Sequence, residues 1–142
     1  MYVRLNIVPI KRRPKADTRH GKAHMYTPRQ TFQEEKAVAE AYKAQDGTFY
    51  ANKTPLRLEL HTYRVLPASR PKKVIRERDT SKPDIDNVLK AVMDGLKGVA
   101  YADDAQVVEV QAIKHDRVRQ NGDFILFEIS PVLLEEEVTD DN

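Results

Sequence analysis

Hydrophobic and polar residues alternate along four segments of the chain, 2–8, 56–65, 106–114 and 125–129. At the start of segment 56–65, for example, leucines stand at every second position and are separated by charged residues. A period of two residues is typical of a β-strand that has one face in the core and the other in solvent. The pattern therefore predicts four strands.

Two further segments carry the signals of helices. Thr27 is predicted to cap the first helix, with Pro28 at its first position and Gln30 completing a capping box. The second helix is predicted to follow Asp86, which is a good N-cap residue, and to run towards Gly98. Each helix lies between two predicted strands.

The order strand, helix, strand, helix, strand, strand predicts an α+β fold, with helices packed on a small mixed β-sheet. At 142 residues the chain is expected to form a single domain, 1–134, followed by an acidic C-terminal tail, 135–142. A four-stranded sheet has edges, and dimerisation is one way to cover an edge.

The formal net charge of +2 hides an asymmetry between the two parts of the chain. Residues 1–82 carry nineteen Lys and Arg against eight Asp and Glu, whereas residues 83–142 carry five against fourteen. The simplest joint interpretation is a polyanion attracted by the first part and a divalent cation held by the second. Two solvated charged faces would produce the same asymmetry.

Composition excludes several classes of protein. The chain has no cysteine, so disulfide frameworks and thiolate zinc sites are excluded, and its four histidines lack the spacing of a zinc site. No segment approaches the roughly 20 apolar residues that span a bilayer, and residues 1–9 do not resemble a signal peptide. We therefore expect a soluble, cytoplasmic protein.

Two basic segments are candidates for nucleic-acid binding, because guanidinium and ammonium groups suit phosphate oxygens. One lies between the first strand and the first helix, and the other is a predicted exposed loop, 67–82, that leads into an acidic stretch. A solvated loop without a function is the alternative for the first segment. The candidate residues are Lys11, Arg12, Arg13, Lys15, Arg70, Lys72, Lys73, Arg76 and Lys82.

The acidic stretch that follows contains Asp84, Asp86 and Lys90. Two carboxylates spaced two residues apart share a face only if the backbone is extended, so a helix that starts late, at Asp86, would let both face one cation. Lys90 then lies one turn beyond Asp86 and can reach over the pair. Asp94 is interpreted as a structural partner of Lys90 or a solvated acid.

Asp104 is the third candidate acid. If the strand at 106–114 is regular back to this point, Asp104 shares its inward face with Val108, and Asp103 points the other way. Three gathered carboxylates usually hold a cation. Caps and turns also favour aspartate, and they are the alternative explanation.

These residues resemble the RusA family of Holliday junction resolvases. The resemblance rests on an Asp-x-Asp-Asn segment, a lysine four residues after the second acid, a helix containing Asp, and an Asp-Asp-Ala-Gln-Val run. In this chain they are 84–87, Lys90, Asp94 and 103–107, and the likeness extends more weakly to 11–15 and 26–28.

The resemblance implies a homodimeric, Mg²⁺-dependent crossover junction endodeoxyribonuclease of DNA recombination and repair, of the kind found in prophages and bacteria. It implies that Asp84, Asp86 and Asp104 bind the metal, for which Mn²⁺ can substitute, and that Lys90 is essential. One ion or two, and four-way junctions or other branched substrates such as flaps and forks, stay open. A protein that binds branched DNA without cutting it is the alternative function.

Overall fold

A four-stranded mixed sheet forms the body of the molecule, in a computed structural model that describes residues 1–18, 21 and 24–135. The strand order is β1 (Val3–Leu5), β8 (Phe124–Pro131), β4 (Leu56–Tyr63) and β6 (Val107–Lys114). Strand β8 is antiparallel to both β1 and β4, whereas β4 and β6 are parallel. A parallel pair needs a crossover connection, and here the crossover contains the second helix.

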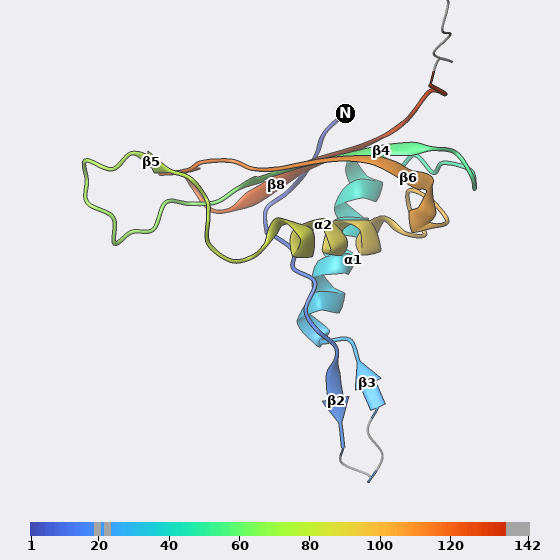
Figure 1. The fold of residues 1–142 in the computed structure, drawn as a ribbon, viewed down its shortest axis with the longest axis horizontal. Coiled ribbons are helices and arrows are strands. Elements are labelled where there is room, and N and C mark those ends of the chain that lie inside the picture. Colours follow the sequence, from blue (N-terminus) through green and yellow to red (C-terminus); the bar gives the residue numbers. More distant parts are fainter. Residues whose placement is uncertain (19–20, 22–23, 136–142) are drawn as a thin grey trace, which may run out of the picture.

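Both helices, α1 (Arg29–Gln45) and α2 (Ile85–Leu96), lie on the same side of this sheet (Figure 1). The predicted α+β class is confirmed, and the main strands and helices follow the predicted order along the chain. None of the helices in the described part of the chain is long and apolar enough to cross a membrane.

The core lies between the sheet and the two helices. Along β4, buried and half-buried residues alternate without interruption, as the sequence period predicts. The leucines of β4 meet Phe127 from β8, Tyr42 from α1 and Leu96 from α2 in one cluster, together with Tyr101 from the loop after α2. This cluster fixes the position of α2 relative to the sheet.

The two helices approach each other closely at Gly95. A Cβ atom at this position would lie 2.7 Å from Val38 Cβ and 2.8 Å from the carbonyl oxygen of Glu35, both on α1. Real side chains do not tolerate such distances, so the absence of a side chain at Gly95 permits the packing.

Two small ribbons that the sequence did not predict project from the body (Figure 1). Strands β2 (Lys15–Asp17) and β3 (His24–Tyr26) form an antiparallel hairpin within the first basic segment. Strands β5 (Arg76–Glu77) and β7 (Arg117–Val118) pair at the base of a projection formed by residues 66–78, which we call the arm. The predicted structureless loop at 67–82 is therefore wrong in part.

Three finer predictions are wrong. Segment 2–8 forms a strand only over Val3–Leu5. Helix α1 begins at Arg29 with Pro28 as its N-cap residue, because the amide of Phe32 bonds to the carbonyl of Pro28, and Thr27 is left outside the helix. Val108 and Val110 are 59% and 45% exposed rather than buried, because β6 is an edge strand and a shift in its register with β4, between Leu56 and Arg57, leaves Val108 without a partner on β4. The prediction for the acidic tail falls on residues outside the described ranges, apart from Glu135.

Candidate active site

Helix α2 starts earlier in the chain than the sequence predicted. The carbonyl of Asp84 accepts hydrogen bonds from the amides of Asn87 and Val88, so the helix starts at Ile85, and Asp84 is its N-cap residue with an extended backbone. Asp86 lies within the first turn. The prediction that Asp86 caps the helix is wrong, because Ile85 packs against the core and takes the helix start with it.

Residues 79–84, which we call the approach segment, are held to the sheet by Lys114 at the end of β6. Its ammonium donates hydrogen bonds to the carbonyls of Ser81 (2.7 Å) and Pro83 (3.0 Å). The carboxylate of Asp79 is fully buried, 3.1 Å from Arg64 and 3.8 Å from Lys114. A buried carboxylate with two cations and anchored carbonyls makes the path of the backbone into Asp84 well determined.

Asp84 itself is half exposed and receives both of its hydrogen bonds from Lys82, at 3.0 Å to each carboxylate oxygen. The Lys82 side chain is 83% exposed. An ion pair this open to water contributes little to stability. It is therefore easily exchanged for another cation.

Asp86, Lys90 and Asp94 follow one another at intervals of four residues and so lie along one stripe of α2. Asp86 and Lys90 are exposed. Asp94 bonds to Lys11 at 2.9 Å, and Lys11 also reaches Glu35 on α1 at 3.3 Å. The prediction that Asp94 is a partner of Lys90 is wrong, because its partner is Lys11. The hydrogen bond to Asp94 raises the pKa of Lys11, and the hydrogen bond to Glu35 raises it further, so this lysine stays charged.

Asp104 lies in a 3-10 helix, η1 (Asp104–Gln106), rather than in a strand, so the parity argument for it is wrong. Its neighbour Asp103 caps η1 by accepting from the amide of Ala105. One carboxylate oxygen of Asp104, Oδ1, is buried and has no hydrogen-bond partner among the residues that the structure describes. A buried oxygen without a partner is costly, and a cation or a water would satisfy it.

Tyr101 shows where Asp104 lies along α2. Its buried hydroxyl donates to the carbonyl of Met93 (2.7 Å). Burial raises the pKa of the Tyr101 phenol, and the carboxylates of Asp104 and Asp94 raise it further. Asp104 is therefore close to the Tyr101 hydroxyl, which lies beside the C-terminal half of α2.

The acids consequently stand at two places on the helix. Asp86 precedes Asp94 by eight residues, about 12 Å along the axis at 1.5 Å per residue. Lys90 lies between them. Within the described residues, no group of three or more Asp, Glu, His or Cys side chains is arranged to hold a metal ion. The single chain thus does not gather Asp84, Asp86 and Asp104 into one set of three ligands.

Gln106 is a site residue that the sequence reasoning did not single out. Its buried side-chain oxygen accepts from the amides of Ala102 and Asp103, and its nitrogen donates to the carbonyls of Ala51 and Thr54. All polar atoms of the amide are used, so Gln106 fixes the loop that carries Asp104. The Asp-Asp-Ala-Gln run contained the signal, since Gln three residues after an Asp cap is a capping box.

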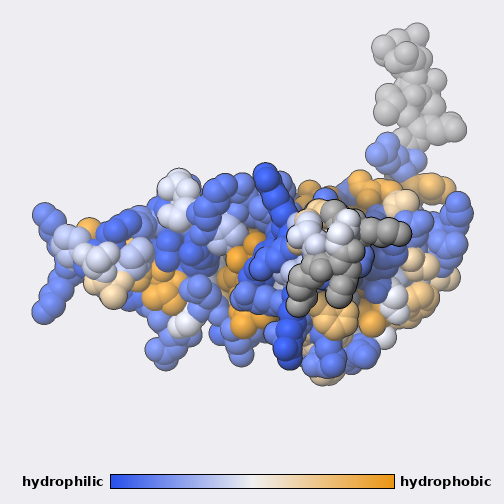
Figure 2. Space-filling view, turned by 90° about the horizontal axis from the view of Figure 1, so that it is seen from below, coloured by the Kyte–Doolittle hydropathy of each residue, from blue (hydrophilic) through white to orange (hydrophobic). Residues whose placement is uncertain are grey.

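The predicted DNA-binding cations fall into two groups. Arg12 makes two hydrogen bonds to Glu34, at 3.0 and 3.1 Å, and with Lys11 it ties the first basic segment to α1. The other seven are exposed: Arg13 and Lys15 at the hairpin, Arg70, Lys72, Lys73 and Arg76 on the arm, and Lys82 before Asp84. Figure 2 shows that hydrophilic side chains dominate the end of the molecule formed by the arm.

The arm is held in shape by polar contacts. The Arg119 guanidinium donates to the carbonyls of Pro71 and Val74, both at 3.1 Å, across the turn at the end of the arm. Arg70 bonds to Glu77 at 2.8 Å. Arg76 and Arg78 approach Asp116 at 3.8 and 3.3 Å. The cations of the arm are therefore presented on an ordered support.

Comparison with known proteins identifies one family. Residues 6–122 match the family model described as endodeoxyribonuclease RusA. An uncharacterised protein of Bacillus subtilis (strain 168), YqaN, is 32% identical over 127 residues, which cover 83% of this chain and 88% of the relative. The family match includes the approach segment, α2 and η1.

Proposed function

Since the chain belongs to the RusA endodeoxyribonuclease family, we propose that it resolves four-way DNA junctions by metal-dependent hydrolysis of phosphodiester bonds. The observation that carries the proposal is that the family match spans every acid and the lysine predicted from the sequence. We further propose that the reaction serves recombination and repair of DNA in the cytoplasm, in a bacterial or prophage setting.

The carboxylates of the proposed site are chemically suited to a hard divalent cation. Mg²⁺ prefers carboxylate oxygens, and Mn²⁺ accepts the same ligands. Asp84 and Asp86 would hold the ion near the start of α2, and Asp104 offers the buried oxygen that lacks a partner. When bound, the ion would activate water and neutralise charge on the phosphate. Because the three acids are not gathered in the isolated chain, binding would require Asp84 to exchange Lys82 for the metal.

Lys90 is proposed to hold the scissile phosphate. It is exposed, one turn from Asp86, and an ordinary lysine is cationic at pH 7 and a poor general base. A fixed ammonium at this place would stabilise the negative charge that develops on the phosphate oxygens.

DNA is proposed to lie across the hairpin and the arm. The exposed cations Arg13, Lys15, Lys72 and Lys73 are available to phosphates, and the exposed Arg70, Arg76 and Lys82 can exchange their acid partners for phosphates. Lys11 and Arg12 would contribute through the field of the segment while keeping their acid partners. A homodimer with twofold symmetry would match the symmetry of a four-way junction.

The absence of three gathered metal ligands in the described residues favours a second candidate, a protein that binds branched DNA without cutting it. In that case Asp84 and Asp103 serve only as cap residues. The two candidates differ in one property, which is metal-dependent nicking that EDTA abolishes.

The decisive experiment incubates the purified protein with a synthetic four-way junction, with a flap and with a duplex, in Mg²⁺ at one salt concentration. We expect paired nicks in two junction strands of like polarity and none after EDTA. The variants Asp84→Asn and Lys90→Ala are expected to bind the junction and fail to cut it. Intact strands with wild-type protein, in Mg²⁺ and in Mn²⁺, would contradict the proposal.

A further inference from the structure

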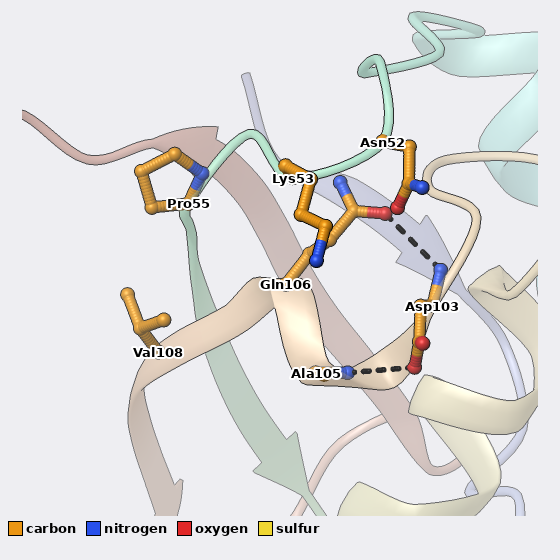
Figure 3. A pocket seen from close by; sticks show the side chains of 7 residues that line it. All are labelled: Asn52, Lys53, Pro55, Asp103, Ala105, Gln106 and Val108. Carbon is orange, nitrogen blue, oxygen red and sulfur yellow. Dashed lines mark hydrogen bonds between the residues drawn. The ribbon is translucent and has the colours of Figure 1, made fainter.

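A hollow of about 240 Å³ lies beside η1, on the side of Asp103 (Figure 3). One wall is the turn that precedes β4, which contributes Asn52 and Lys53. The other wall is the η1 segment with Asp103, and Pro55 and Val108 add apolar surface. The hollow is therefore one residue along the chain from Asp104, and none of the proposed catalytic residues lines it.

The turn holds Lys53 in an unusual backbone conformation. The amide of Thr54 bonds to the carbonyl of Ala51, which closes a β-turn with Lys53 at its third position. Lys53 has φ of 74° and is the one non-glycine residue with positive φ in the described part of the chain. Glycine or asparagine is the usual residue at such a position. A lysine at this position carries a conformational cost, which makes its side chain a candidate for a functional role.

Gln106 fixes the two walls of the hollow relative to each other. Its amide bonds to Ala51 and Thr54 on one wall and to Ala102 and Asp103 on the other. The hollow is thus formed before any ligand arrives. Preformed hollows with a few polar groups are the usual form of small ligand sites.

The chemistry of the walls selects the ligand. A phosphate would be attracted by Lys53 and repelled by the carboxylate of Asp103. A nucleobase has hydrogen-bond donors and acceptors on one edge and apolar faces. Lys53 can donate to its acceptors, Asp103 can accept from its amino or imino group, and Pro55 and Val108 can contact its face.

We propose that this hollow holds one unstacked nucleobase of the bound DNA, next to the phosphodiester that is cut. The inference rests on the proposed function, because it uses a branched substrate in which bases are already partly unstacked. It makes Lys53 and Asn52 the residues that sense the base at the cleavage position.

The test uses a four-way junction in which the cut position has been mapped. Single abasic sites replace each of the two nucleotides on either side of the cut phosphate. Cleavage rates and binding affinities, the latter by fluorescence anisotropy, are measured for each substrate. At one abasic position we expect the wild-type rate to fall about tenfold or more.

The variant Lys53→Gly separates the side chain from the fold. Glycine adopts positive φ without strain, so the midpoint of thermal unfolding should not fall. We expect this variant to cut the intact junction about tenfold more slowly and to lose little more on the sensitive abasic substrate, because both changes remove one contact. Lys36→Ala, which removes the same charge from the exposed face of α1, is the control and should behave as wild type.

Three outcomes would overturn the proposal. In the first, the losses of cleavage rate caused by Lys53→Gly and by the abasic site multiply. In the second, no abasic position lowers the cleavage rate. In the third, Lys53→Gly weakens binding of every substrate equally and lowers the salt dependence of binding by about one phosphate contact. If wild type cuts no junction, the proposed function fails. The affinities then carry the test, since coupling between Lys53 and one base in binding supports the hollow and independence contradicts it.

Discussion

The two ends of α2 are built for different purposes. At the C-terminal end, Gly95 and Leu96 are buried against α1 and the sheet, and Asp94 is engaged by Lys11. At the N-terminal end, Asp84, Asp86 and Lys90 are exposed, and the pair between Lys82 and Asp84 is open to water. The C-terminal end carries the close contact with α1, and the exposed face of the N-terminal end carries charges that packing does not use.

The contrast between the two ends shows how a helix can present a reactive group with little loss of folding stability. The exposed acids at the start of the helix are compatible with its dipole, which favours negative charge there. Substitution of the exposed charges at the N-terminal end should therefore lower activity, and substitution at the packed C-terminal end should lower stability.

The largest expected effect is on catalysis, at the N-terminal end. Asp86→Asn should lower junction cleavage about 100-fold or more, because a neutral amide binds a divalent cation far less well than a carboxylate. The free energy of unfolding should change by less than about 1 kcal/mol, since Asp86 is exposed. Cleavage assays and thermal unfolding measure the two quantities, and Glu40→Gln, an exposed acid on α1, is the control. Equal losses of stability and activity would contradict the separation.

The next effect is on stability, at the C-terminal end. Gly95→Ala should lower the free energy of unfolding by about 1–3 kcal/mol, because the new methyl group meets Val38 and the backbone of Glu35. Urea denaturation measures the change. In a Val38→Ala background, which removes one of the crowding atoms, the same substitution should cost less. An unchanged midpoint would show that α1 and α2 can separate freely.

A smaller effect is expected for the ion pair that ties the first basic segment to α2. Lys11→Met should cost about 0.5–1 kcal/mol, because Lys11 is partly buried and bonds to two acids. A double-mutant cycle with Asp94→Asn isolates the pair. If Lys11→Met leaves stability intact and instead weakens DNA binding as much as Lys72→Ala does, Lys11 acts on DNA rather than on the fold.

The smallest effect concerns the face of the sheet opposite the helices, where His115 stacks on Tyr63 and its Nε2 lies 2.8 Å from His61 Nδ1. Burial and then His61 lower the pKa of His115, while Asp116 opposes them. The unfolded chain, with an ordinary value near 6.5, therefore binds the proton more readily, and stability should fall as pH drops below about 6.5. Denaturation at pH 7.5 and 5.5 should show a smaller difference in His115→Gln than in wild type, with His24→Gln as the exposed control.

The sequence predicted the elements whose pattern is set by burial. Segment 56–65 alternates because β4 lies in the middle of the sheet with one face in the core, and the β4 strand confirms it. The same reasoning failed for Val108, because the period of a strand does not reveal the shift in register that leaves Val108 without a partner on β4, and for Val110, because β6 is an edge strand. Edge strands expose residues that the pattern places inside.

The candidate site was predicted less completely. The residue types and their order came from the sequence, but the start of α2 depended on Ile85 joining the core, which local cap preferences do not reveal. The partner of Asp94 comes from a segment more than eighty residues away in the chain, so helical spacing could not identify it. The roles of Asp84, Asp86, Lys90 and Asp104 stay predictions until the variants are measured.

The acceptors that Arg119 uses have an electrostatic consequence. Arg70 faces Glu77, and Arg76 and Arg78 share Asp116, so two carboxylates offset part of the charge of these three arginines at a distance. Arg119 bonds instead to backbone carbonyls, which satisfy its N–H groups and carry no net charge. Its positive charge therefore remains available beyond the protein surface while its side chain is immobilised. The group that shapes the turn of the arm thereby also adds to the long-range attraction for a polyanion.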